Sequence, residues 1–128
     1  MSSSGVEGGD FIAKSIPFVN TTSPSGNQAV AFRSMGNRTA LYHCSFRGYH
    51  DTLFVQHDHQ FYKDCQIYGA IDFIFGDTTV MFQNCFIYVL ERVAEAVITT
   101  QGRTCYSSTS GIVIHNSIIT ADRKSSPL

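Results

Sequence analysis

The sequence predicts an all-β protein, a parallel β-helix of few coils, because it contains an internal repeat made of short β-rich runs. Three segments of eight residues align without gaps when Cys44, Cys65 and Cys85 are superposed, and these cysteines are 21 and 20 residues apart. A coil of about 20 residues with two or three short strands is typical of a parallel β-helix. The alternative is a small antiparallel sandwich in which the similarity of the segments is accidental.

Residues 10–122 are expected to form the coils, flanked by two segments outside them. We expect residues 1–9 to be a disordered or non-native N-terminal segment and residues 123–128 to be a frayed polar tail. Between these segments, runs rich in β-branched and aromatic residues alternate with Gly, Asn, Asp and Ser, which is typical of strands and turns. The clearest of these runs are Leu53–Gln56, Asp72–Phe75 and Val80–Gln83.

One stretch fits a helix better than a strand. Apolar residues recur at helical spacing from Leu90 to Ile98, and Glu91 and Glu95 lie on the opposite face. The stretch predicts either a short helix attached to the coil or a loop that enters a strand near Ala96.

Length, composition and charge exclude several classes of protein. A chain of 128 residues suits one domain, and 43% hydrophobic with 15% charged residues argues against wholesale disorder. No apolar run reaches the roughly 18 residues of a membrane-spanning helix. The net charge of −1, without a basic block, makes nucleic acid an unexpected partner. The N-terminus has neither the charged nor the apolar region of a secretion signal.

The repeat also brings two aspartates to one position of successive coils. Asp51 and Asp72 each follow their cysteine by seven residues, and rungs of a β-helix stack ~4.8 Å apart. Two carboxylates about 5 Å apart repel by about 3 kcal/mol at an effective dielectric constant of 20. One should therefore hold a proton while the other is ionised, which supplies an acid and a nucleophile. The alternative is a pair of solvated turn aspartates that are displaced laterally.

Stacking has a similar consequence for the cysteines. Equivalent positions would bring the Cα atoms of Cys44 and Cys65 within the roughly 4.4–6.8 Å that a disulfide requires. The cluster His57–His59 suggests a metal site, but alternation along a strand or at a loop tip explains it without one, and no metal is expected.

Three motifs then follow one another at intervals of about 22 residues: Gly26–Arg33 (GNQAVAFR), Gly48–Leu53 (GYHDTL) and Asp72–Gly76 (DFIFG). Two further stretches, Gln60–Cys65 (QFYKDC) and Thr100–Thr104 (TQGRT), accompany them. Together they resemble the central part of the catalytic domain of plant pectin methylesterases (pectinesterases). The resemblance implies a right-handed single-stranded parallel β-helix, truncated here, and an enzyme that needs no cofactor.

The resemblance further implies an aspartyl esterase that hydrolyses the methyl esters of pectin (homogalacturonan) to pectate and methanol. Asp72 matches the nucleophile, and Asp51 matches the acid that protonates methanol and then the base that activates water. Gln28 matches a glutamine that binds substrate and helps to hold the oxyanion. Tyr49 is expected to face the sugar groove. Phe73 is a further candidate substrate contact, although a place in the core is favoured for its ring.

The chain departs from the family pattern at the second oxyanion donor, where His50 replaces a glutamine. A neutral imidazole still donates one hydrogen bond, whereas a protonated His50 would lower the pKa of Asp51 and weaken proton donation at acidic pH. We therefore predict low activity, which His50→Gln improves. The substrate-binding Gly-Arg-Pro-Trp segment and the amino-terminal coils of the family are missing, which suggests a fragment or a truncated gene product. Exposed rung edges then favour self-association.

The cysteines depart from the family as well. Several members bridge the position of Cys85 to a cysteine at a position that is Ser117 here. A disulfide between Cys44 and Cys65 is the favoured bridge, whereas Cys85 and Cys105 either pair, remain free or link chains.

Two other functions stay open from the sequence. One is a pectin-cleaving glycosidase, because paired carboxylates about 5 Å apart suit retaining glycoside hydrolysis. The other is a truncated, non-catalytic relative that binds pectin. The family resemblance implies a secreted protein of the plant cell wall or apoplast, and a pectinesterase inhibitor protein as a partner.

Overall fold

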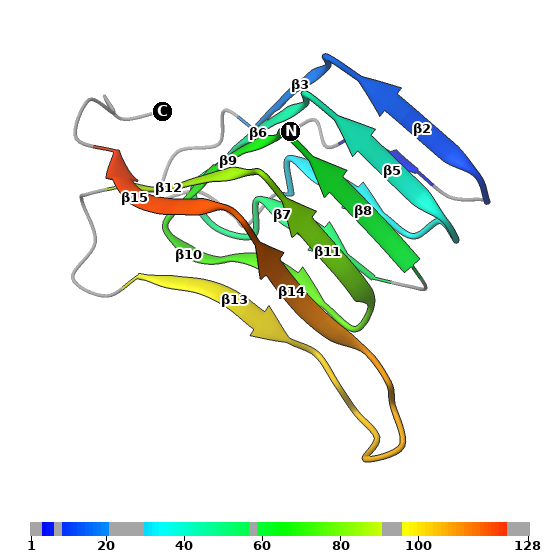
Figure 1. The fold of residues 1–128 in the computed structure, drawn as a ribbon. Coiled ribbons are helices and arrows are strands. Elements are labelled where there is room, and N and C mark those ends of the chain that lie inside the picture. The colour runs from blue at the N-terminus through cyan, green and yellow to red at the C-terminus, as the bar shows by residue number, and fades with distance from the viewer. Residues whose placement is uncertain (1–3, 7–8, 21–29, 57–58, 91–95, 123–128) are drawn as a thin grey trace.

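Strands of the chain wind into a parallel β-helix (Figure 1). The structure, a computed structural model, describes residues 4–6, 9–20, 30–56, 59–90 and 96–122. These residues contain fifteen strands and no helix. Each strand pairs in parallel with the strand three before it, the strand three after it, or both, so each coil contributes one strand to each of three sheets. The fold class predicted from the repeat is confirmed.

Each of the three sheets contains five strands. Sheet A is formed by β1 (Ser4–Val6), β4 (Phe32–Ser34), β7 (Leu53–Val55), β10 (Ile71–Gly76) and β13 (Val97–Gln101). Sheet B is formed by β2 (Phe11–Lys14), β5 (Thr39–Tyr42), β8 (His59–Lys63), β11 (Thr79–Gln83) and β14 (Gly111–His115). Sheet C is formed by β3 (Pro17–Val19), β6 (Ser45–Arg47), β9 (Gln66–Gly69), β12 (Phe86–Leu90) and β15 (Ile118–Asp122).

The turn between sheets B and C recurs in the same conformation from coil to coil. His43, Asp64 and Asn84 each precede a cysteine and have φ angles of 53°, 54° and 54°. Asp and Asn tolerate this left-handed conformation because their short polar side chains form local hydrogen bonds. The identical turns keep successive coils in register, which places the three cysteines of the repeat above one another.

Large apolar side chains fill the space between the sheets. Tyr62 and Phe82 are fully buried, and their rings stack with centroids 4.9 Å apart. Phe46 packs edge-on against Tyr62 at 5.6 Å. The buried hydroxyl of Tyr62 donates a hydrogen bond to Oε1 of Gln60 (2.8 Å), whose amide nitrogen donates to the carbonyl of Ser34 (3.1 Å). Burial of polar groups in this core is thereby compensated by hydrogen bonds.

One segment differs from the expectation of the sequence. Ser4–Val6 lies in the region that we expected to be disordered, but it forms β1 and pairs with β4, whose edge supplies backbone partners. At the described ends of the stretch from Leu90 to Ile98, Leu90 ends β12 and Val97 begins β13, which agrees with the expected entry into a strand near Ala96. Residues 91–95 and the tail 123–128 lie outside the described residues. Within the described ranges, no helix is long and apolar enough to cross a membrane.

Candidate active site

Asp51 and Asp72 lie on neighbouring rungs of sheet A. His50 forms a parallel bridge with Ile71, and Leu53 pairs with Ile74 two positions after the aspartates. Both pairings join residues 21 positions apart, so Asp51 stands opposite Asp72. The charge of Asp72 acts on the carboxyl group of Asp51. The two aspartates of the repeat are therefore neighbours in space.

A local irregularity of the backbone directs both aspartates outward. Asp51 and Asp72 have φ angles of 50° and 47°, in the left-handed region that non-glycine residues seldom adopt. The register of β10 with β13 shifts between Ile71 and Ile74, as in a β-bulge. Phe73 and Ile74 are consequently both buried, although neighbours on a regular strand face opposite sides. Left-handed residues and bulges recur at functional sites because they re-aim side chains.

Thr100 joins the aspartates from the next coil. Its hydroxyl donates a hydrogen bond of 2.6 Å to Oδ1 of Asp72. Thr100 lies on β13 opposite Phe75, three residues after Asp72 on β10. Thr100 lies in one of the stretches that resemble the family, but its spacing from Asp72 gave it no predicted role, because the coil between the two residues is longer than the repeat.

The environment of Asp51 favours its protonated form. Burial raises the pKa of Asp51 above its usual value, the positive charge of His50 lowers it, and the negative charge of Asp72 raises it. The sequence analysis expected a lowering by His50. His50 does act in that direction, but burial outweighs it, and the resulting pKa of Asp51 is raised.

The residues before Asp51 are half-buried and contact each other. The ring of Tyr49 packs edge-on against the imidazole of His50, with centroids 4.9 Å apart. His50 lies beside both carboxyl-bearing turns because it pairs with Ile71. Gln28, the third polar group that the family resemblance suggests for the site, lies outside the described residues.

The side chain of Phe73 packs in the core, the place that the sequence favoured for its ring, and presents no surface to a substrate. Its side chain is fully buried. The ring occupies the space above Gly69, where an added Cβ would lie only 2.2 Å from Cγ of Phe73. The bulge that turns Asp72 outward turns its neighbour inward, so Phe73 packs in the core.

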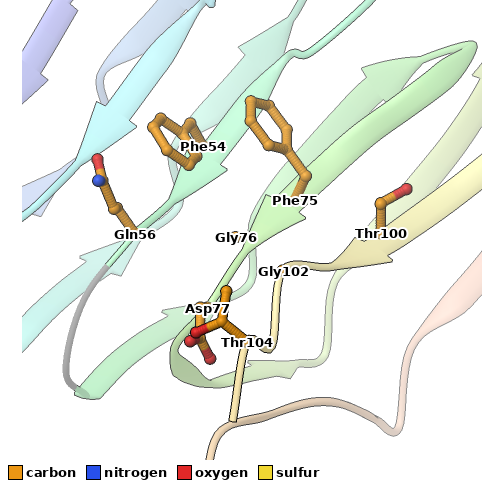
Figure 2. Close-up of a pocket in the computed structure, with 8 residues that line it drawn as sticks. All are labelled: Phe54, Gln56, Phe75, Gly76, Asp77, Thr100, Gly102 and Thr104. Atoms are coloured by element: carbon orange, nitrogen blue, oxygen red, sulfur yellow. The ribbon is translucent and has the colours of Figure 1, made fainter.

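A pocket of about 320 Å³ adjoins the aspartates on the outer face of sheet A (Figure 2). Its lining consists of Phe54, Gln56, Phe75, Gly76, Asp77, Thr100, Gly102 and Thr104. The rings of Phe54 and Phe75 are stacked 4.5 Å apart and 8° from parallel. The guanidinium of Arg33 lies 5.6 Å from the centre of the Phe54 ring. No role was predicted for this surface from the sequence. The repeat does contain a signal for it, because each ring follows one of the two aspartates by three residues.

A comparison with known protein families identifies the family of the chain. The sequence model of the family described as Pectinesterase matches residues 1–128. The chain belongs to the pectinesterase family.

Two curated pectinesterases and one solved structure illustrate the relationship. The chain is 53% identical over 117 residues to a probable pectinesterase/pectinesterase inhibitor 60 of Arabidopsis thaliana, which covers 90% of this chain and 22% of that protein. It is 46% identical over 117 residues to pectinesterase 2 of Citrus sinensis, which covers 91% of this chain and 23% of that protein. Pectin methylesterase from carrot superposes with a TM-score of 0.85 at 36% identity, covering 93% of this chain and 39% of that chain. The chain thus spans less than a quarter of the length of these curated pectinesterases.

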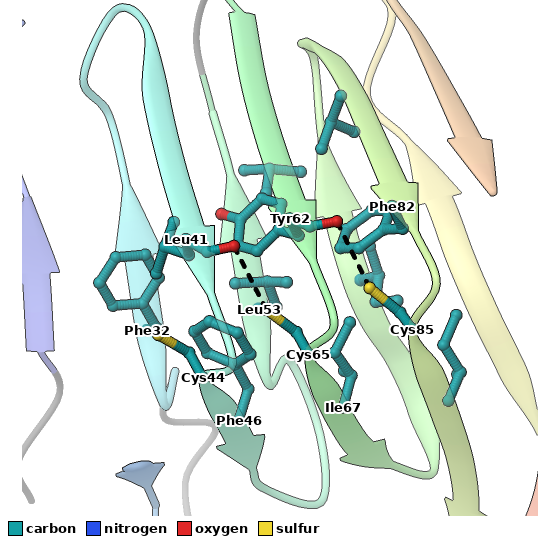
Figure 3. Close-up of a cluster of buried hydrophobic side chains, with 14 of the residues drawn as sticks. Phe32, Leu41, Cys44, Phe46, Leu53, Tyr62, Cys65, Ile67, Phe82 and Cys85 are labelled. Carbon is teal, nitrogen blue, oxygen red and sulfur yellow. Dashed lines mark hydrogen bonds between the residues drawn. The ribbon is translucent and has the colours of Figure 1, made fainter. Parts of the chain in front are cut away.

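The four cysteines of the chain are free thiols, so the expected disulfide between Cys44 and Cys65 is absent from the structure. Cys44, Cys65 and Cys85 are buried on successive coils (Figure 3). Sγ of Cys65 lies 3.5 Å from the carbonyl oxygen of Leu41, and Sγ of Cys85 lies 3.4 Å from that of Tyr62. Each thiol thus has two backbone carbonyls within reach, one in the preceding coil and one two residues before it in its own coil, and forms no disulfide.

Two further positions, Cys105 and Ser117, bear on the expected disulfides. Cys105 is exposed in the connection between β13 and β14, which extends away from the coils (Figure 1), and its thiol is also free. Ser117 lies beside Cys85, whose backbone N–H donates a hydrogen bond of 3.0 Å to the serine hydroxyl.

Proposed function

We propose that this pectinesterase hydrolyses methyl esters of pectin, with Asp72 as the nucleophile and Asp51 as the proton donor. The observation that carries the proposal is the unequal environment of two adjacent carboxyl groups. Burial and the charge of Asp72 raise the pKa of Asp51, which favours its acid form, whereas Asp72 accepts a hydrogen bond from Thr100. Two carboxyl groups in different environments supply the acid and the nucleophile that acyl transfer needs.

In the first half of the proposed reaction, a carboxylate oxygen of Asp72 attacks the C6 carbonyl carbon of a methylated galacturonate. The carbonyl oxygen becomes an oxyanion. When the intermediate collapses, the bond to the methoxy oxygen breaks and Asp51 donates its proton to that oxygen. Methanol leaves, and the acyl group remains on Asp72 as an anhydride.

In the second half, Asp51 acts as a base. Its carboxylate takes a proton from water, and the resulting hydroxide attacks the C6 carbonyl carbon. The bond to Asp72 breaks and returns the nucleophile as a carboxylate. The new galacturonic acid releases its proton to solvent, and Asp51 is protonated again for the next cycle.

The pocket beside Thr100 supplies a place for sugar units next to the reacting ester. Phe54 and Phe75 offer a continuous apolar surface, and pockets lined by aromatic side chains with a few polar groups are typical binding sites. We assign the oxyanion to the imidazole N–H of His50 and to the Gln28 amide. Tyr49, which contacts His50, is assigned to the sugar groove.

The proposal extends to the surroundings of the protein. Its substrate would be the homogalacturonan of the plant cell wall, which places the protein outside the cell in the apoplast, where a pectinesterase inhibitor protein is a candidate partner. The proposal includes self-association through the edges of the outermost strands, because β3 and β15 of sheet C each pair with one strand only among the described residues.

Release of methanol from highly methylated pectin tests the proposal. We expect Asp72→Asn to abolish release, because an amide is a poor nucleophile. Asp64→Asn is the matched control. Asp64 has the same left-handed backbone (φ 54°), but it lies in the turn between β8 of sheet B and β9 of sheet C. Methanol release that persists in Asp72→Asn contradicts the assignment. New reducing ends without methanol would indicate a glycosidase. Binding of pectin with neither product would indicate a non-catalytic relative.

A further inference from the structure

A threonine hydroxyl lies between the pocket and the candidate nucleophile. Thr100 lines the pocket together with Phe54 and Phe75, and its Oγ1 atom is 2.6 Å from Oδ1 of Asp72. Such a distance is typical of a hydroxyl that donates to an ionised carboxylate, for which O···O separations of about 2.5–2.7 Å are usual. Thr100 therefore contacts the nucleophile and the space for substrate at once.

The backbone around the two residues explains why they meet. Phe75 pairs with Thr100 in sheet A, so their side chains share the outer face. On a regular strand Asp72, three residues before Phe75, would face the core. The register shift after Ile71 and the left-handed backbone of Asp72 bring the carboxylate to the outer face, beside Thr100. A single bulge thus creates both the exposure of the nucleophile and its contact with the threonine.

We propose that Thr100 is a positioning residue, whose hydroxyl holds one oxygen of Asp72 so that the other points toward the ester carbonyl. This inference rests on the proposed function. The terminal torsion of an aspartate is broad and poorly constrained by its own backbone, so a carboxylate without a fixed partner samples many orientations. Thr100 sits on a strand, and its β-branched side chain has restricted rotamers, which makes it a rigid donor.

The expected consequence is kinetic. Holding a nucleophile in an attacking geometry lowers the barrier of the chemical step, and a small misplacement is costly. A residue that positions the nucleophile without binding the sugar should affect kcat and leave KM nearly unchanged.

Three variants test the inference through methanol release at a series of pectin concentrations. We expect Thr100→Val, which has the same shape without the hydroxyl, to lower kcat by roughly tenfold, with KM changed by less than about twofold. Thr100→Ser keeps the hydroxyl and should recover most of the lost kcat. Thr99→Val is the matched control, because Thr99 is exposed on the same strand and pairs with Ile74 instead of Phe75, and its kcat should equal that of the parent protein.

The outcomes separate the inference from the proposed function. If Asp72→Asn abolishes activity while Thr100→Val keeps the parent kcat, the positioning role is wrong and the proposed nucleophile stands. Equal losses in Thr100→Val and Thr100→Ser would also overturn it, since the hydroxyl would then not matter.

A crystal structure of the protein provides a readout that does not depend on activity. We expect Oγ1 of Thr100 within hydrogen-bond distance of Asp72, and a rotated or doubly occupied carboxylate in Thr100→Val. If the protein releases no methanol, the proposed function fails and the crystal structures alone decide the contact. A Thr100 hydroxyl turned away from Asp72, or a carboxylate orientation identical in both structures, overturns the inference.

Discussion

Phe54 and Phe75 stack face to face on the outer surface of sheet A, with centroids 4.5 Å apart. Each ring follows one of the two aspartates by three residues. The same 21-residue step that pairs Leu53 with Ile74 pairs Phe54 with Phe75, so one register produces both the acidic pair and the aromatic pair. The surface that would hold sugar units and the groups that would perform the chemistry are therefore parts of one repeated element.

Removing one of these rings should weaken substrate binding. We expect Phe75→Ala to raise KM for methylated pectin by roughly tenfold with a smaller effect on kcat, because the ring contacts the sugar and not the reacting ester. Phe61→Ala is the matched control, since Phe61 is also half-buried, on the outer face of sheet B, with an edge contact to Tyr42. Equal effects of the two substitutions on KM would contradict a binding role for the pocket.

Asp51→Asn should stabilise the fold while it abolishes activity. The pKa of Asp51 is raised above 3.8, mainly by burial. Well below pH 3.8 the group is protonated in both folded and unfolded chains and has no effect. As the pH rises, the unfolded chain loses this proton more readily, so ionisation of Asp51 lowers the free energy of unfolding.

Urea denaturation of Asp51→Asn and its parent at pH 7 and well below pH 3.8 measures this effect. We expect a gain below about 1 kcal/mol at pH 7, since solvent screens a partly exposed group, and no gain at the lower pH. The left-handed backbone at residue 51 also accepts asparagine. A loss of stability at pH 7 would contradict the prediction.

His50→Gln should increase methanol release. A protonated His50 lowers the pKa of Asp51 and so favours loss of the proton that methanol needs, whereas a glutamine amide donates a hydrogen bond without a charge. The increase should be larger at acidic than at alkaline pH. Rates measured at both check the prediction, and a lower rate in the variant at acidic pH would show it to be wrong.

Only one of the four thiols should react quickly in the folded protein. A hydrogen bond with Ser107 lowers the pKa of the exposed Cys105. The pKa of Cys85 is also lowered, by its hydrogen bond with Cys65, but Cys44, Cys65 and Cys85 are buried and out of reach of a reagent. The thiolate is the reactive form. A chromogenic thiol reagent should therefore detect one fast thiol, absent in Cys105→Ser, and all four after denaturation. Detection of only two thiols in the denatured, unreduced protein would indicate a disulfide.

Gly76→Ala should destabilise the fold strongly. Gly76 has a φ of 141°, and an added Cβ would lie 1.6 Å from the carbonyl oxygen of Val55, which is backbone and does not rotate away. We expect a loss of more than about 2 kcal/mol in the free energy of unfolding. Gly111→Ala is the control, because nothing lies within 4 Å of its added Cβ. Similar unfolding midpoints for the two variants would contradict this reasoning.

The amino-acid sequence alone determined which residues share a rung. The spacing of Cys44, Cys65 and Cys85 predicted the coil, and the coil predicted that Asp51 and Asp72 are neighbours, because a regular repeat converts distance along the chain into position in a stack. Family motifs added candidate roles for the same residues.

Only the tertiary structure decided where individual side chains point. Phe73 and Asp72 exchange the faces that a regular strand would assign to them, since a bulge and a left-handed residue break the alternation. Thr100 reaches Asp72 across a coil longer than the repeat, so no spacing revealed the contact. The thiols of Cys65 and Cys85 face backbone carbonyls, a choice set by side-chain direction within the packed core and not by the separation of the cysteines along the chain.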